Sequence, residues 1–157
     1  SGVFYLVQET MTPNGGDRNL FLQYAAASAP EYQILDNFGH PDAKLGVDGN
    51  RQSASLYDLI PAKPQNGKPH GEWNTAKIVV RNGKVSHWQN GVEVLTYELW
   101  TPEWVRMLAE SKFGPGEWDI AFELMRNAGG EKHEGYITLQ DHGDDVWYRN
   151  FRIKELK

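Results

Sequence analysis

The chain has 157 residues, a net charge of −5, 39% hydrophobic residues and 24% charged residues, which is typical of a globular protein rather than a disordered one. No run rich in lysine and arginine occurs, so a nucleic-acid partner is not expected, and no apolar run is long enough to span a bilayer. Cysteine is absent, which excludes disulfides, thiolate nucleophiles and cysteine-ligated zinc.

Short strands dominate the predicted secondary structure. Residues 2–9 alternate between apolar and polar positions, and residues 30–37 look extended. Residues 53–60 are predicted to form a strand that ends at a proline. Residues 73–99 form three further strands, because Asn-Gly pairs at 82–83 and 90–91 predict tight hairpin turns. The last predicted hairpin spans residues 136–153.

One helix is predicted near residues 102–112. Thr101 can cap its first turn, Pro102 suits the first helical position, and Trp104 and Leu108 provide an apolar face. Three other segments are less defined: 10–19 has loop composition, 20–29 permits a helical turn, and 118–125 fits either a helix or a short strand. Many short strands with one short helix predict an all-β fold, an antiparallel sandwich or jelly roll.

Five segments, in their order and spacing, carry a resemblance to one family. They are APEYQILDN (29–37), SASLYDLIPAKP (53–64), GEWNTAKIVVRNGKVSHWQNGVEV (71–94), ESKF (110–113) and GYITLQDHGDDVWYRNFRIKEL (135–156). Together they resemble the 3-keto-disaccharide hydrolase family. The resemblance implies a concanavalin-like jelly-roll β-sandwich, formed as a single domain over residues 1–157.

The resemblance also carries expectations about context. The opening SGVFYLV is similar to a strand that the family places after its opening strands. We therefore expect those strands to be missing from this chain, and the missing N-terminal segment of the same protein to be a partner. Family members are usually exported bacterial proteins, so an extracytoplasmic location, periplasmic or secreted, is expected. The implied ligand is a carbohydrate, an oxidised glucoside.

The implied chemistry starts from a ketone at C3 of a glucoside. The ketone acidifies the hydrogen at C2, so a base can remove it and the group at C1 can leave by elimination. Addition of water then completes a net hydrolysis. Such a site needs a base with a pKa near the working pH, an acid for the leaving oxygen and a group that stabilises the enolate. A divalent metal is one candidate for that last role.

Two strand positions are candidates for this site. Glu31 and Gln33 share one face of their strand because successive side chains alternate, and we assign Glu31 a catalytic role and Gln33 a substrate-binding role. The alternative is a solvated strand face. His87 is a candidate general base, and a hydrogen-bonded structural histidine is the alternative.

Loops supply the remaining candidates. Glu72, Trp73 and Asn74 are assigned to substrate binding, although Trp73 alone would more often plug a core. The other candidates lie in and around the last predicted turn: Asp141 and His142 as catalytic residues, Gln140 and Arg149 as substrate-binding residues. Ordinary turn chemistry accounts for an aspartate and a glycine there, but it does not account for the histidine.

A metal site is only weakly indicated. Six residues carry suitable oxygen or nitrogen ligands, but their spacing is not diagnostic: Glu31, Asp36, Glu72, His87, Asp141 and His142. The cofactor therefore stays unknown.

Three functions remain open on these grounds: a hydrolase or lyase that acts on 3-keto-glucosides, a non-catalytic carbohydrate-binding module of the same fold, and a chain with no activity by itself. The fold cannot decide between the first two. If the chain is an enzyme, five ionisable residues should converge in one concave site: Glu31, Glu72, His87, Asp141 and His142.

Overall fold

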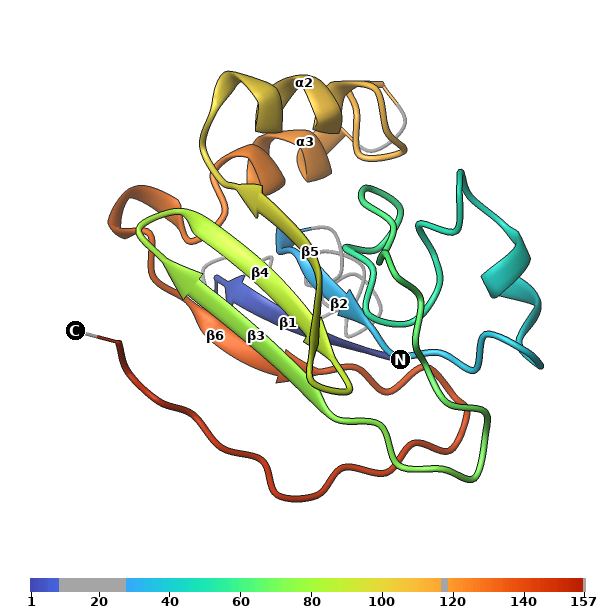
Figure 1. The fold of residues 1–157 in the computed structure, drawn as a ribbon. Coiled ribbons are helices and arrows are strands. Elements are labelled where there is room, and N and C mark those ends of the chain that lie inside the picture. The colour runs from blue at the N-terminus through green and yellow to red at the C-terminus, as the bar shows by residue number, and fades with distance from the viewer. Residues whose placement is uncertain (9–27, 117–118, 157) are drawn as a thin grey trace.

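Two three-stranded antiparallel sheets face each other in the part of the chain that the computed structural model describes, residues 1–8, 28–116 and 119–156 (Figure 1). The first sheet has the order β2-β1-β6 and the second the order β3-β4-β5. The strands are β1 (Gly2–Val7), β2 (Glu31–Gln33), β3 (Ala76–Arg81), β4 (Lys84–Gln89), β5 (Val92–Glu98) and β6 (Tyr136–Leu139). The predicted all-β sandwich is confirmed.

The core lies between the two sheets. Val3 and Tyr32 from the first sheet are buried with Val85 and Val94 from the second. The hydroxyl group of Tyr32 donates a hydrogen bond of 3.1 Å to the backbone carbonyl of Trp88. This contact ties the inner face of the first sheet to β4.

Both Asn-Gly pairs form the predicted hairpin turns. Asn82 and Gly83 connect β3 to β4, Asn90 and Gly91 connect β4 to β5, and all four residues have positive φ angles, between 50° and 81°. Two successive positive φ angles are what a type I′ turn requires, and asparagine and glycine tolerate them best.

Helix α2 (Pro102–Ala109) confirms the predicted helix. The hydroxyl of Thr101 accepts a hydrogen bond of 3.1 Å from the backbone N–H of Trp104, which satisfies one of the free amides of the first turn. Trp104 and Leu108 are buried, as their spacing predicted.

A second helix, α3 (Asp119–Arg126), occupies the segment that fitted either a helix or a strand. The two helices lie side by side at one end of the sandwich (Figure 1), where the indole N–H of Trp104 donates to the carbonyl of Met125 at 3.1 Å. Two short 3-10 helices, η2 (Pro41–Lys44) and η3 (Gly130–Lys132), complete the described elements. No helix of the described residues is both long enough and apolar enough to cross a membrane.

The predicted strand over residues 53–60 is wrong. Ala54 and Asp58 have positive φ angles, so the chain turns twice where a strand would run straight. Leu56 and Ile60 exchange backbone hydrogen bonds of 3.0 Å. What remains of strand structure is a bridge from Leu56 to Tyr32 and another to Ile60.

The predicted hairpin over residues 136–153 is wrong in its second half. β6 pairs with β1, with Thr138 opposite Phe4, but the chain does not fold back onto β6. Positive φ angles at Gly143 and Asn150 redirect it, and residues 141–156 run as an irregular segment along the outside of the sandwich (Figure 1, red). The predicted loop at 10–19 and most of the ambiguous segment at 20–29 lie outside the described residues.

Candidate functional site

The outer face of the first sheet, the face turned away from the second sheet, carries three of the predicted site residues. Tyr32 points inward to the core, so its neighbours Glu31 and Gln33 point outward. Gln33 lies opposite Gly2, and the backbone N–H of Gln140 donates to the carbonyl of Gly2 at 3.0 Å. Residues that are paired across strands share a face, so Gln33 and Gln140 flank Gly2 on the same face as Glu31.

Gly2 makes room for the carboxyl group of Glu31. A Cβ atom built on Gly2 would lie 1.9 Å from Oε1 of Glu31, so the carboxyl group occupies the space that any other residue would fill. Glu31 is only 9% exposed and Gln33 only 4%. The alternative of a solvated strand face is therefore wrong for both residues.

A segment beside β2 extends this face. The backbone N–H of Tyr57 donates to the carbonyl of Glu31 at 3.1 Å, and that of Gln33 donates to Ser55 at 3.1 Å. This pairing places Tyr57 directly beside Glu31. The amino group of Lys112, from the loop after α2, lies 4.1 Å from the centre of the Tyr57 ring.

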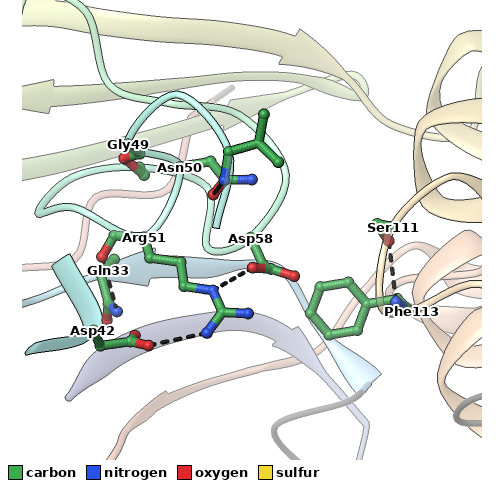
Figure 2. A network of polar contacts seen from close by, with 10 residues as sticks. Gln33, Asp42, Gly49, Asn50, Arg51, Asp58, Ser111 and Phe113 are labelled. Carbon is green, nitrogen blue, oxygen red and sulfur yellow. Dashed lines mark hydrogen bonds and ion pairs between the residues drawn. The ribbon is translucent and has the colours of Figure 1, made fainter. Parts of the chain in front are cut away.

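Charged groups surround this edge of the sheet (Figure 2). Arg51 donates from Nη1 to Asp42 at 3.0 Å and from Nε to Asp58, and its backbone carbonyl accepts from the side-chain amide of Gln33 at 3.3 Å. The guanidinium of Arg51 also lies 5.6 Å from the ring centre of Tyr57. Arg51 is therefore bonded to two carboxylates at once.

The pKa of Glu31 is raised to about 7, because burial penalises its charged form, while the positive charges of the Ser1 amino group and, to a smaller extent, of Lys112 work in the opposite direction. Burial lowers the pKa of Lys112 and raises that of Tyr57 to about 12. Glu31 is thus a carboxyl group that gains and loses its proton near neutral pH, which is the property a general base needs.

His87 lies on the opposite side of the first sheet, inside the core. Its Nδ1 donates to the carbonyl of Ala54 at 2.9 Å, and its Nε2 accepts from the hydroxyl of Tyr5 at 2.7 Å. It has no exposed surface, and burial lowers its pKa to about 4. Both ring nitrogens are satisfied within the protein, so the structure places His87 as a neutral structural residue, away from Glu31.

The loop residues before β3 lie at the surface. Asn74 accepts hydrogen bonds of 2.8 Å from the backbone of Lys68 and from the side chain of Asn90, which closes the loop. Trp73 is 45% exposed, so it does not plug the core. The guanidinium of Arg149 lies 4.0 Å from its ring centre, and this pair forms an exposed aromatic and cationic platform. Glu72, beside it, is also exposed.

Ordinary turn chemistry accounts for Asp141 and Gly143 in the acidic turn. The backbone N–H of Gly143 donates to the side chain of Asp141 at 3.0 Å, and both Asp141 and His142 are exposed. From the same segment, Tyr148 reaches back to Ser1, with 2.8 Å between their hydroxyl oxygens. The charge of Glu31 contributes to the raised pKa of Tyr148, although burial is the larger cause.

The expected convergence of all five ionisable residues fails at His87, which lies in the core on the other side of the first sheet from Glu31. Glu31 lies on the outer face of the first sheet and His87 in the core, while the other three are on exposed loops: Glu72, Asp141 and His142. The six candidate metal ligands do not gather either, since the described residues contain no cluster of three histidine, aspartate or glutamate side chains that could hold a metal ion.

Four residues near Glu31 were not predicted: Arg51, Tyr57, Lys112 and Tyr148. Three of them lie inside segments that carry the family resemblance: Tyr57, Lys112 and Tyr148. Their proximity to Glu31 could not be inferred from spacing, because each belongs to a different part of the chain. A separate hollow of about 280 Å³ between β5 and α2 contains none of the predicted residues.

Comparison with known proteins places the chain in a family. The model of the 3-keto-alpha-glucoside-1,2-lyase-like domain matches residues 1–154. The chain belongs to this family. A 3-keto-disaccharide hydrolase from Bacteroides thetaiotaomicron is 61% identical over 156 residues, which are 99% of this chain and 53% of that protein. The chain thus spans about half the length of this curated relative.

The fold also matches a solved structure. A crystal structure of a candidate glycosyl hydrolase from Parabacteroides distasonis superimposes with a TM-score of 0.61 at 23% identity, covering 87% of this chain and 56% of that one. At this identity the likeness shows the fold alone, and it agrees with the sandwich described above.

Proposed function

We propose that this chain takes part in the cleavage of 3-keto-glucosides, with Glu31 as the base that removes the proton from C2. The observation that carries the proposal is the buried carboxyl group of Glu31 on the outer face of the first sheet, with a pKa of about 7 and with the charge of Lys112 acting on it. A 61% identical relative that bears the name 3-keto-disaccharide hydrolase supports the substrate class.

The proposed reaction has two steps. Glu31 takes the proton from C2, the electron pair forms the C1–C2 double bond, and the C1–O bond breaks as the leaving oxygen accepts a proton from an acid. Water then adds across the double bond, with oxygen bonding to C1 and a proton returning to C2. A base with a pKa close to the working pH combines an ionised form with useful basicity.

A neighbouring amide suits sugar recognition. Gln140 lies beside Gly2 on the face of Glu31, and an amide group donates to and accepts from sugar hydroxyls. The amide of Gln33 is already hydrogen-bonded to the backbone of Arg51 and Ile34. The exposed platform of Trp73 and Arg149 offers a second surface on which the apolar side of a sugar ring can stack.

The test is turnover of 3-keto-trehalose and 3-keto-lactose by the complete protein. Glu31→Gln keeps the shape of the side chain and removes its basicity, so we expect turnover to fall by roughly 10²- to 10⁴-fold. Glu93→Gln, an exposed carboxylate on β5, is the matched control and should behave like the wild type. Full turnover by Glu31→Gln would refute the role of Glu31.

A carbohydrate-binding module is the second candidate, and the position of His87 in the core, away from Glu31, favours it. Calorimetry with the same two sugars separates the candidates. Saturable binding without turnover in the wild type would establish the binding module, and turnover would establish the enzyme.

A further inference from the structure

Two side-chain cations, Arg51 and Lys112, lie over the ring of Tyr57, and only Arg51 is bonded to carboxylates. Arg51 is bonded to both Asp42 and Asp58. Lys112 makes no ion pair within 4.0 Å among the described residues. Its amino group rests on the ring of Tyr57, 4.1 Å from the ring centre.

The loop that carries Lys112 is held in place on both sides. The hydroxyl of Ser111 donates to the carbonyl of Leu108 at 2.8 Å and accepts from the backbone N–H of Phe113 at 3.1 Å (Figure 2 shows the second bond). A Cβ atom on Gly114 would lie 2.5 Å from the carbonyl of Ala109, so the loop packs tightly against the end of α2. Lys112 itself is half-buried.

Tyr57 connects this lysine to the candidate base. Its backbone pairs with that of Glu31, so its side chain lies next to Glu31 on the outer face. The ring attracts the ammonium group through its electron-rich face. The charge of Lys112 therefore acts on Glu31, and more strongly on Asp58, without a salt bridge to either carboxylate.

We propose that the amino group of Lys112 binds the C3 carbonyl oxygen of the sugar and stabilises the enolate that forms there. This inference rests on the proposed function. When Glu31 takes the proton from C2, the negative charge moves from its carboxylate to the oxygen at C3. A cation that faces both positions stabilises the product of this transfer without having to move. Arg51 would have to break its bonds to Asp42 and Asp58 to do the same.

The test isolates proton abstraction from elimination. The probe is 1,5-anhydro-3-keto-glucitol, a 3-keto sugar that has no exocyclic leaving group at C1, and NMR in D2O follows the exchange of its C2 hydrogen. We expect Lys112→Met to slow this exchange by roughly 10²- to 10³-fold, and Lys112→Arg to recover part of the rate because it restores the charge. Lys84→Met, an exposed lysine at the start of β4, is the matched control.

The pH dependence of the exchange rate tests whether Lys112 acts on Glu31 through its charge or has only a structural role. The charge of Lys112 holds down the pKa of Glu31, so its removal should move the acidic limb of the exchange rate to higher pH. Circular dichroism shows whether a variant is folded. If Lys112→Met does not fold, the exchange rate of Lys112→Arg is compared with that of the wild type instead.

Two results would overturn the assignment of Lys112 while leaving the proposed function intact. One is a Lys112→Met variant with the exchange rate and pH profile of the wild type. The other is wild-type exchange that is abolished by a chelator, which would give the stabilising role to a metal ion. Absence of both exchange and turnover in the wild type would instead refute the proposed function itself, and this inference with it.

Discussion

Glu31 and His87 are both buried ionisable residues, and they lie on opposite sides of the same sheet. His87 is enclosed by the rings of Tyr5, Tyr32 and Tyr97, and both of its nitrogens are hydrogen-bonded to the protein. Glu31 instead lies among charged groups at the sheet edge, with Lys112 and Asp42 both acting on its pKa.

The difference shows that burial alone does not decide whether a group titrates near neutral pH. Burial favours the neutral form of both groups, so it raises the pKa of Glu31 to about 7 and lowers that of His87 to about 4. Near neutral pH, Glu31 therefore titrates while His87 stays uncharged. A perturbed pKa indicates a functional site when it falls in the working range and charged partners stand nearby.

The largest expected effects are opposite for the two residues: a variant of Glu31 should lose turnover, and a variant of His87 should lose stability. Glu31→Gln should lose roughly 10²- to 10⁴-fold in turnover with little loss of stability. His87→Ala leaves a cavity and an unpaired Ala54 carbonyl, so it should lose roughly 3–5 kcal/mol of unfolding free energy while folded molecules keep their turnover. Urea unfolding measures the stability of each variant, and steady-state kinetics measure its turnover. A His87→Ala protein that is stable but inactive would show that His87, and not only Glu31, is needed for the reaction.

The second prediction concerns stability against pH. Glu31 has a folded pKa of about 7, above its ordinary 4.5, so its contribution is full below pH 4.5 and is lost as the pH rises through 7. His87 has a folded pKa of about 4, below its ordinary 6.5, so its contribution is full above pH 6.5 and is lost as the pH falls through 4. Each is worth up to about 3 kcal/mol, and the two offset each other in the wild type.

Single variants should separate these contributions. On acidification from pH 7 to pH 4.5, the unfolding free energy of Glu31→Gln should fall relative to the wild type, and that of His87→Gln should rise. Urea unfolding at several pH values measures both differences. Variant curves that run parallel to the wild-type curve would show that neither residue titrates as described.

The third prediction concerns the space that Gly2 provides. In Gly2→Ala the new Cβ atom would lie 1.9 Å from Oε1 of Glu31, so the carboxyl group must move. Since small displacements of a reacting group are costly, we expect turnover to fall roughly 10- to 100-fold. The free energy of unfolding should also fall, by roughly 1–3 kcal/mol, because Cγ and Cδ of the buried Glu31 side chain lie 2.6 Å from the new Cβ atom as well. Unchanged turnover would argue that the position of this carboxyl group does not matter to the reaction.

The smallest effect is expected at the acidic turn. Asp141→Ala removes one exposed hydrogen bond to Gly143, so stability should change by no more than about 0.5 kcal/mol. Because the structure places this side chain on an exposed segment, turnover should stay within roughly threefold of the wild type. A tenfold loss of turnover in the same kinetic assay would show that Asp141 takes part in the reaction.

The parts of the fold that were predicted correctly depend on neighbouring residues. The Asn-Gly turns, the cap at Thr101 and the apolar face of α2 follow from short-range spacing. The errors arise where a positive φ angle breaks an alternating pattern, as at Ala54 and Asn150. A run of strand-forming residues does not reveal such a break.

The sequence by itself determined that Glu31 and Gln33 share one strand face, because side chains alternate along any strand. It also determined the family, through the combined motifs. Only the tertiary structure decided that Glu31 and His87 lie on different sides of the first sheet, and that Lys112 lies on the ring of Tyr57. Burial and the distances between charges set the pKa of each group, and both depend on contacts between residues far apart in the chain.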